Sequence, residues 1–157
     1  MTPAEFKTKW AKVTAKESSA YQSHFDDLCR MLDVAPPLEA DPSGEDFFCF
    51  QKGVIKDAGA PDGTGPDGKK RKGWADVWRK GCFGWEYKGQ HKDLDEAHRQ
   101  LRQYRESLES PPLLVVCDFN RFIIHANFTD AVPHEYAFTR DQIDTPEVLR
   151  LLRSLFT

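Results

Sequence analysis

Two acidic residues and a lysine lie in a segment whose other residues suit a pair of β-strands. Asp76 and Glu86 are separated by nine residues, and Lys88 follows Glu86 at a spacing of two. Side chains two apart on a strand share a face, so Glu86 and Lys88 point to the same side of a sheet. A hairpin brings Asp76 alongside Glu86 at little cost in chain entropy. The spacing predicts two carboxylates and an ammonium group together on one face.

Such a trio suits the hydrolysis of a phosphodiester. Two neighbouring carboxylates repel each other, and a divalent cation between them removes the repulsion. Mg²⁺ prefers oxygen ligands and keeps several waters when one or two carboxylates hold it. The cation polarises a phosphoryl oxygen and lowers the pKa of a bound water, and Lys88 offsets charge on the phosphate. A Glu-x-Lys triplet alone is common by chance, so a surface Glu–Lys pair beside an unrelated Asp76 is the alternative.

The composition predicts one globular domain over residues 1–157. The hydrophobic fraction is 39% and the charged fraction 30%, which is ordinary for a soluble protein with a core. No apolar run approaches the ~20 residues that a membrane span needs, and the first residues lack the apolar centre of a signal peptide. We therefore expect a cytoplasmic protein without a membrane partner. The four cysteines form no Cys-x-x-Cys pair, so we expect reduced, mostly buried thiols rather than zinc or disulfides.

The charge is slightly acidic overall and basic in one place. The formal net charge is −3, so binding of a polyanion depends on local charge. The dense basic run is Lys69, Lys70, Arg71 and Lys72. It ends a segment rich in Gly, Pro and Asp, residues 57–72, which is predicted to be a mobile loop between strands. The alternative for the run is a solvated loop without a ligand. No Gly-x-x-x-x-Gly-Lys-Ser/Thr sequence is present, so no ATP site is expected.

Periodicity predicts an α/β fold with a mixed central sheet flanked by helices. The order is a helical region, three strands, a helix, two strands and a helix. The ranges are residues 1–35 for the N-terminal helical region, 46–55, 74–79 and 83–88 for the three strands, 93–108 for the helix, 113–118 and the segment after it for the next two strands, and 145–156 for the C-terminal helix with Thr145 as its cap. Leu94, Ala97, Leu101, Tyr104 and Leu108 form the inward stripe of the middle helix.

The histidines carry no clear pattern. His91 and His98 flank the start of the middle helix, and we expect them to be solvated or to face a nucleic acid rather than to bind a metal. His24, His125 and His134 have no spacing that suggests a partner.

The catalytic trio and the helix after it resemble a known superfamily. Asp76, then Glu86-Tyr87-Lys88, resembles the D-x(n)-E-x-K signature of the PD-(D/E)XK nucleases, and the order of strands and helix fits their core. Gln100 and Tyr104 resemble the Q-x-x-x-Y motif of the RecB-like branch. The stretch "GWADVWRKGCFGWEYKGQHKDLDEAHRQLRQYRESLESPPLLVVCD" is similar to the N-terminal nuclease domain of MmeI-type (Type IIL) restriction-modification enzymes. Ala75 stands where the superfamily has proline, a change that touches no ligand.

This resemblance implies a restriction-endonuclease-like core over residues 74–118 and a role for each site residue. Asp76, Glu86 and the Tyr87 carbonyl would bind Mg²⁺, for which Mn²⁺ can substitute, and Lys88 would activate the water. Gln100 and Tyr104 would support the site or touch the DNA backbone; a polar residue and an aromatic at a helix–sheet contact are the alternative. Glu17 lies on the first helix, where some relatives carry an extra acid, and a solvated helix residue is its alternative. The basic run Lys69–Lys72 would contact DNA phosphates.

The implied function is Mg²⁺-dependent endonucleolytic cleavage of double-stranded DNA that leaves 5′-phosphate and 3′-hydroxyl ends. MmeI-type enzymes also carry a methyltransferase and a target-recognition domain, and no Asn-Pro-Pro-Tyr methyltransferase motif is present here. We therefore expect those domains in a longer chain or in a separate partner. The alternatives are a stand-alone RecB-like repair nuclease and an inactive DNA-binding or interaction module of the same fold.

Overall fold

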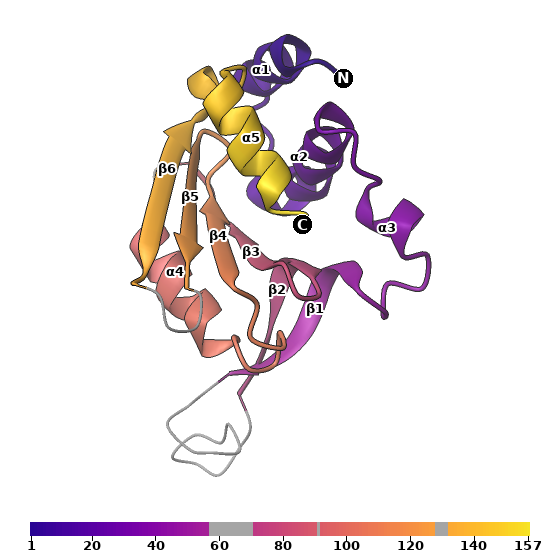
Figure 1. Ribbon diagram of the computed structural model, residues 1–157, viewed down its shortest axis with the longest axis vertical. Helices are drawn as coiled ribbons and strands as arrows, with labels where there is room; N and C mark the ends of the chain where they lie inside the picture. Colours follow the sequence, from indigo (N-terminus) through magenta and orange to yellow (C-terminus); the bar gives the residue numbers. More distant parts are fainter. Residues whose placement is uncertain (57–70, 91, 128–131) are drawn as a thin grey trace.

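The fold is built around one six-stranded sheet, shown in Figure 1. The computed structural model describes residues 1–56, 71–90, 92–127 and 132–157. The strands follow the chain order across the sheet, and every neighbouring pair is antiparallel except β3 and β4, which run parallel. The strands are β1 (Phe48–Lys56), β2 (Arg71–Arg79), β3 (Phe83–Tyr87), β4 (Leu113–Cys117), β5 (Arg121–Ala126) and β6 (His134–Thr139). The predicted mixed sheet and α/β class are confirmed.

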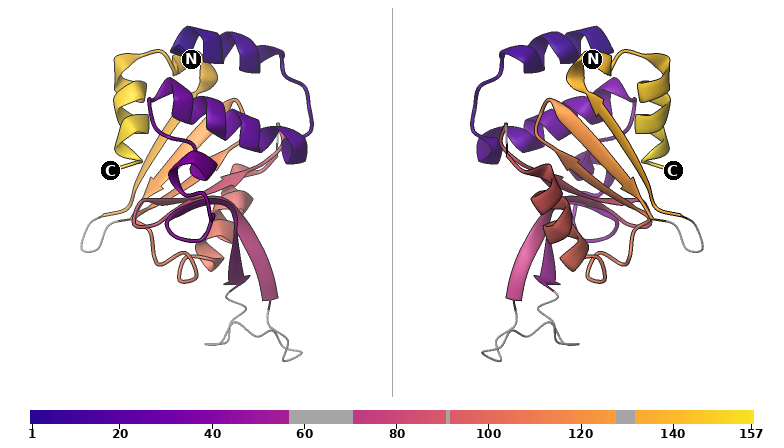
Figure 2. Two further views of the ribbon diagram at one scale, coloured as in Figure 1. Left: turned by 90° about the vertical axis from the view of Figure 1, so that its right-hand side faces the viewer. Right: turned by 90° about the vertical axis from the view of Figure 1, so that its left-hand side faces the viewer.

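Helices cover both faces of the sheet, as Figures 1 and 2 show. The parallel β3 and β4 need a crossover connection, and α4 (Leu94–Gln103) supplies it. α4 packs on one face, against Trp78, Leu114 and Val116 among others. The opposite face carries α1 (Pro3–Lys12), α2 (Glu17–Met31) and α5 (Pro146–Ser154). A short α3 (Pro37–Ala40) and a 3₁₀ helix (Arg140–Gln142) complete the described elements.

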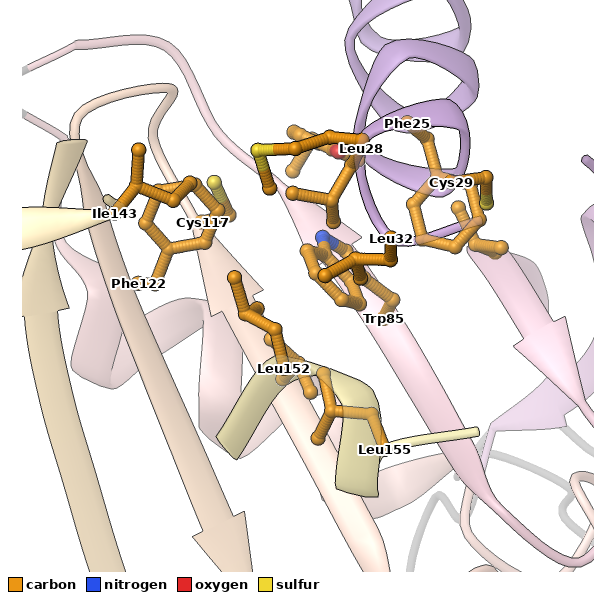
Figure 3. Packing of buried hydrophobic residues seen from close by; sticks show 14 of the residues in the cluster. Phe25, Leu28, Cys29, Leu32, Trp85, Cys117, Phe122, Ile143, Leu152 and Leu155 are labelled. Carbon is orange, nitrogen blue, oxygen red and sulfur yellow. The ribbon is translucent and has the colours of Figure 1, made fainter. Parts of the chain in front are cut away.

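The larger core lies between the sheet and α1, α2 and α5. Phe83, Trp85 and Tyr87 alternate along β3 and bury their rings on this face. Figure 3 shows Trp85 beneath Phe25 and Leu28 of α2, with the ring centroids of Phe25 and Trp85 5.1 Å apart and nearly perpendicular. Such edge-to-face contacts stabilise aromatic pairs beyond their buried area. The alternation leaves Gly84 and Glu86 for the other face of β3, as predicted.

The N-terminal helical region consists of two helices rather than one continuous segment. α1 ends at Lys12, and the backbone at Val13 is extended. The turn lets Phe6 and Trp10 of α1 contact the same buried ring, His24 of α2. The break thus allows both helices to bury their apolar faces in one core.

The middle helix is shorter than predicted. α4 ends at Gln103, and residues 104–109 form turns. Trp78 Nε1 donates a hydrogen bond of 2.9 Å to the carbonyl of Leu108, and Glu109 and Ser110 adopt positive φ angles. Tyr104 and Leu108 are still buried. The helical spacing of these two residues therefore predicted their burial correctly, but both side chains are buried from a series of turns rather than from a helix.

β6 is an element that the sequence analysis missed. Only Phe138 of its residues is buried, so the strand lacks the apolar alternation on which such predictions depend. Its backbone pairing with β5, from Arg121 with Thr139 to Ala126 with His134, defines it instead.

The predicted loop over residues 57–72 is only partly within the described structure. β2 begins at Arg71, which pairs with Lys56 of β1, and Lys72 pairs with Ile55. The backbone of these two basic residues therefore belongs to a strand, and the predicted loop boundary is wrong by two residues. Residues 57–70, including Lys69 and Lys70, lie outside the described residues.

The remaining bulk predictions concern cysteines and membranes. Cys29, Cys49 and Cys117 are buried, Cys82 is partly buried, and none is in a disulfide, as expected. Among the described helices, none has both the length and the apolar character needed to span a bilayer.

His24 is a buried base within the aromatic core. Its Nδ1 lies 2.8 Å from the Tyr87 hydroxyl, and its ring contacts Phe119 and Phe122 as well as α1. Burial, with a smaller contribution from the charge of Arg140, lowers the pKa of His24 to about 3. The imidazole is therefore neutral in the folded protein at neutral and mildly acidic pH.

We predict that His24 makes the protein sensitive to mild acid. In the unfolded chain His24 has a pKa of about 6.5, and below this pH it binds a proton only when the chain is unfolded. As the pH decreases below about 6.5, the free energy of unfolding therefore falls by up to ~1.4 kcal/mol per pH unit. Urea unfolding between pH 7 and 5 measures this slope. His24→Gln, which does not titrate, is expected to show a shallower slope, whereas the exposed His134→Gln keeps that of the wild type. Equal slopes in wild type and His24→Gln would contradict the assignment.

Candidate active site

The site is centred on Asp76 and Glu86 on adjacent strands. The β2–β3 register pairs Val77 with Trp85, and the next position along each strand brings Asp76 beside Glu86. The exposed fractions are only 5% for Asp76 and 9% for Glu86. The two carboxyl groups share a hydrogen bond, and Asp76 Oδ2 also accepts one of 2.8 Å from the backbone N–H of Tyr87. The predicted proximity of the two acids is thus present and buried.

Burial determines how this pair is charged. It raises the pKa of both carboxyls because it disfavours the charged form. For Glu86 the hydrogen bond and charge of Asp76 raise the pKa further, to about 10. The hydrogen bonds that Asp76 accepts from Glu86 and from the Tyr87 N–H lower the pKa of Asp76 and so oppose the effect of burial. Glu86 is therefore protonated at neutral pH and donates a hydrogen bond to Asp76.

Lys88 and Gln100 meet beside the carboxyl pair. Lys88 directly follows β3, and its backbone N–H donates to the Cys117 carbonyl at 2.8 Å, which continues the pairing with β4. Its ammonium Nζ donates to Gln100 Oε1 at 3.2 Å. Lys88 lowers the pKa of both carboxyls. Gln100 therefore holds the ammonium group of Lys88 near Asp76 and Glu86.

Tyr104 and Glu17 complete the group of predicted residues. Tyr104 is the C-cap residue of α4 and is buried; burial and then the charges of Glu86 and Asp76 raise the pKa of its phenol. Glu17 is the first residue of α2. Burial and then the charge of Asp76 raise its pKa, and Lys88 lowers it. Residues from α2, β2, β3 and α4 therefore converge, and Glu17 is not a remote solvated residue.

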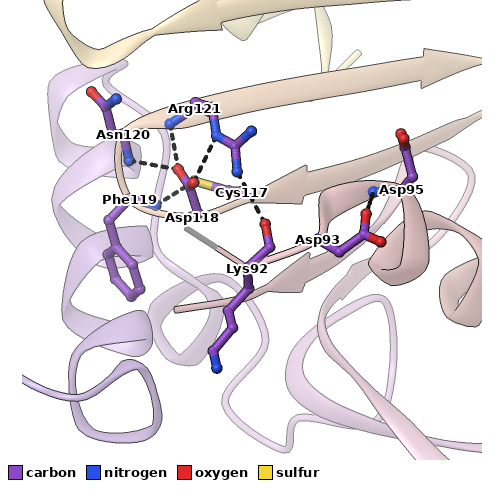
Figure 4. Close-up of polar contacts among 8 residues, drawn as sticks. All are labelled: Lys92, Asp93, Asp95, Cys117, Asp118, Phe119, Asn120 and Arg121. Carbon is purple, nitrogen blue, oxygen red and sulfur yellow. Dashed lines mark hydrogen bonds and ion pairs between the residues drawn. The ribbon is translucent and has the colours of Figure 1, made fainter. Parts of the chain in front are cut away.

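A polar turn at the end of β4 holds the segment that follows Lys88. Figure 4 shows Asp118 accepting hydrogen bonds from the backbone N–H groups of Asn120 and Arg121, with its second oxygen 2.8 Å from Arg121 Nε. The same guanidinium donates to the Lys92 carbonyl at 3.1 Å. The turn is thereby tied to the connection between β3 and α4.

Two hollows border the site. A cavity of about 260 Å³ opens beside Glu17 and Gly89, between α1 and the residue that follows Lys88. A polar groove of about 820 Å³ begins at Gln90 and is lined by three cations and three acids, which are Lys92, Arg121, Arg140, Asp93, Asp118 and Asp141. The sequence analysis did not single out these cations. They come from three separated segments and each stands near an acid, so no local charge run marks them.

Comparison with known proteins places the chain in a family. The family described as "MmeI, N-terminal domain" matches residues 1–155. The chain belongs to this MmeI N-terminal domain family. Neither the curated proteins nor the solved structures compared with the chain provide a match. The family puts the chain in the context of restriction-modification enzymes, as the resemblance of the segment from Gly73 to Asp118 implied.

The donor set of this MmeI N-terminal domain fits Mg²⁺ better than a metal that needs many protein ligands. Within the described parts of the chain, no three His, Cys, Asp or Glu side chains are grouped to hold a metal. Asp76 and Glu86 supply two carboxylates, and Mg²⁺ is commonly held by one or two carboxylates with waters in the other positions. The Tyr87 carbonyl as a further ligand stays a prediction.

We predict that the carboxyl pair of this MmeI N-terminal domain destabilises the metal-free fold as the pH rises. Glu86 is protonated in the folded protein and ionised in the unfolded chain above pH ~4.5, so its contribution to stability is lost as pH rises toward its folded pKa. Urea unfolding in chelator is expected to show Glu86→Gln more stable than wild type at pH 8, by about 1 kcal/mol or more, and similar to it near pH 4.

The exposed Glu106→Gln is the matched control and is expected to follow the wild type at both pH values. A difference in stability between Glu86→Gln and wild type that stays constant with pH would show that the pKa of Glu86 is the same in the folded and unfolded chains, and would contradict the prediction.

Proposed function

We propose that this chain is the Mg²⁺-dependent endonuclease module of a restriction-modification enzyme and hydrolyses phosphodiester bonds of double-stranded DNA. The observation that carries the proposal is the buried Asp76–Glu86 pair with the Lys88 ammonium held beside it by Gln100. Burying two acids together is unfavourable for folding. A site that nevertheless keeps them, in a chain of the MmeI N-terminal family, supports a function that needs both.

Each residue has a role in this proposal. Asp76 and Glu86, with the Tyr87 carbonyl, would hold Mg²⁺, for which Mn²⁺ can substitute. The bound ion would polarise the phosphoryl oxygen and lower the pKa of a coordinated water. Metal binding requires both carboxylates to be ionised, so Glu86 gives up its proton when the site is loaded.

Lys88 acts on the water and the phosphate rather than on the metal. Its ammonium, oriented by the hydrogen bond to Gln100, positions the attacking water and offsets negative charge on the phosphate as it becomes five-coordinate. The water oxygen bonds to phosphorus as one of its protons passes to solvent, the bond from phosphorus to the 3′ oxygen breaks, and that oxygen takes up a proton from solvent. The products are a 5′-phosphate and a 3′-hydroxyl. Tyr104 and Glu17 support the two carboxylates from α4 and α2.

DNA binding by this chain alone is expected to be weak and without sequence preference. The net charge is −3, and the polar groove beside Gln90 is lined by as many acids as cations. The basic residues Lys69, Lys70, Arg71 and Lys72 are proposed to contact phosphates. A methyltransferase and a target-recognition domain, in the same longer chain or in a partner, would supply the affinity and the sequence specificity.

A second enzyme function is a RecB-like repair nuclease. The contact of Gln100 with Lys88 and the burial of Tyr104 near Glu86 favour it, because these residues form the Q-x-x-x-Y pattern of that branch. Comparison of linear, circular and branched DNA as substrates separates the two functions: a repair nuclease prefers ends or branches, and a restriction module cuts circular duplex.

We predict metal-dependent cleavage when the chain is recruited to DNA. The 157-residue chain is fused to a sequence-specific DNA-binding module and incubated with plasmid that carries one recognition site. Mg²⁺ or Mn²⁺ is expected to produce cuts near that site with 5′-phosphate ends, and chelator is expected to abolish them. Asp76→Asn and Glu86→Gln are expected to lose at least ~100-fold in rate, since each removes a metal ligand.

The control for these variants is Glu96→Gln, which changes an exposed acid on α4 and is expected to cleave like the wild type. The same DNA-binding module without the chain must leave the plasmid intact. Absence of metal-dependent cuts in the wild-type fusion would make the chain an inactive binding module. Undiminished cleavage by Asp76→Asn would remove the carboxyl pair from the mechanism.

We predict that Lys88→Met separates metal binding from turnover. The ammonium is not a metal ligand, so calorimetric titration is expected to show Mn²⁺ bound at least as tightly as by wild type, while cleavage by the fusion falls by ~100-fold or more. Gln100→Ala is expected to give a smaller loss of cleavage, because it frees the ammonium without removing it. Loss of Mn²⁺ binding in Lys88→Met would contradict the role proposed for this lysine.

A further inference from the structure

A second cluster of titratable side chains lies on the flank of α4 that faces β5 and β6. Gln100 and Lys88 meet on the α4 side nearest to the carboxyl pair. His98 projects instead toward β5, where its ring stacks on that of His125 with centroids 3.4 Å apart and planes 9° apart. The sequence analysis expected His98 to be solvated or to face nucleic acid and found no partner for His125. The structure adds what spacing could not show, because each of these half-buried histidines stacks on the other.

The stacked pair forms part of the wall of a pocket of about 270 Å³. Arg102 and Arg105 line the same pocket from α4 and the turn after it, and Leu114 and Ala126 form an apolar part of its wall. Glu135 lies at its β6 side. The lining residues that carry a fixed charge are thus two guanidinium groups and one carboxylate.

Two buried polar atoms in this pocket have no partner. Arg105 donates through one terminal nitrogen to the Asn127 carbonyl at 3.1 Å, but its Nε is buried without an acceptor, and His125 Nε2 is buried without a partner. Across the described residues only four side-chain atoms are in this situation. Both residues line the pocket, so each has hydrogen-bonding capacity there that no described group uses, and an unmet buried donor costs about 1–3 kcal/mol.

We propose that this His98–His125 pocket binds the oxyanion of a phosphate group. Two arginines and two imidazoles offer more donors than the two oxygens of a carboxylate engage, whereas a phosphate presents three or four oxygens. The planar guanidinium group also matches the geometry of phosphate oxygens. The apolar wall of Leu114 and Ala126 leaves room for the organic part of a phosphate ester.

The protonation of the histidine pair supports an anion as the ligand. Burial, the neighbouring His125 and the charge of Arg102 lower the pKa of His98 to about 4, against a smaller opposing effect of Asp95. Burial also lowers the pKa of His125, while Glu135 and Asp95 raise it and Arg102 lowers it. Both rings are therefore neutral at pH 7. A bound phosphate favours their charged forms and therefore raises the pH at which the two rings titrate.

The test is a titration of the 157-residue chain with inorganic phosphate, followed by NMR of isotope-labelled histidine side chains. The experiment is done at pH 7 in chelator, with chloride at equal ionic strength as the reference salt. Phosphate is expected to shift the His98 and His125 signals in a saturable manner and to raise the pH at which they titrate. Arg102→Gln is expected to weaken binding by about tenfold or more, as loss of a charge-assisted hydrogen bond implies.

Matched variants make the result specific. Arg99→Gln removes an equally exposed arginine of α4 that does not line the pocket, and it is expected to bind phosphate like the wild type. Asp76→Asn is also expected to leave these shifts unchanged, so the pocket can be established even if the proposed nuclease function fails. Shifts that do not saturate, that chloride reproduces, or that persist with equal affinity in Arg102→Gln would overturn the proposal.

A second experiment tests whether the phosphate group that the pocket binds belongs to DNA or to a small molecule. A short DNA duplex is added to the phosphate-loaded protein. Displacement of phosphate from the His98 and His125 signals would assign the pocket to a backbone phosphate of DNA. Retention of phosphate would assign it to a free phosphate or a small phosphate ester.

Discussion

The parallel pairing of β3 with β4 is the constraint on which the arrangement of the site depends. Two parallel strands cannot be joined by a tight turn, so the chain must cross over between them, and α4 makes that crossing. The crossing lays α4 over the face of β3 that carries Gly84 and Glu86, with Leu101 and Leu108 against the sheet. Gln100 and Tyr104 thereby reach Lys88 and the carboxyl pair. The N–H of Lys88 also bonds to β4, so the same pairing fixes the backbone at the lysine itself.

One face of β3 carries residues of the hydrophobic core, and the other face carries Glu86 of the candidate site. Phe83, Trp85 and Tyr87 anchor the strand in the aromatic core formed with α2 and α5. Because the strand is fixed by these large rings, Glu86 between them has little freedom to move away from Asp76. The Tyr87 N–H further orients Asp76 through a hydrogen bond. The core thus holds together two acids that would separate in a less rigid sheet.

The close approach of the two buried carboxyl groups, Asp76 and Glu86, is unfavourable for folding, and it lies where the chemistry is proposed to occur. Burial and proximity raise the pKa of Glu86 so that the pair retains a proton, and the fold gives up stability to keep it there. In the proposed function, Asp76 and Glu86 would hold a divalent cation, which would replace that proton. Metal affinity would then depend on the same two residues that lower the stability of the metal-free fold. α4 lies between the Asp76–Glu86 pair and the pocket lined by His98 and His125, so one helix contributes residues to both proposed sites.

The sequence by itself determined the parts that depend on local spacing. Alternation in β3 predicted which side chains share a face, the hairpin between β2 and β3 predicted that Asp76 meets Glu86, and the cap at Thr145 predicted α5. Only the tertiary structure decided the rest. Four features depend on segments far apart in the chain. They are the electrostatic influence of Asp76 and Lys88 on Glu17, the end of α4 at Gln103, the exposed strand β6 and the stacking of His98 on His125. Their energies come from packing, burial and backbone pairing between those segments, and these interactions leave no periodic pattern in the residues that make them.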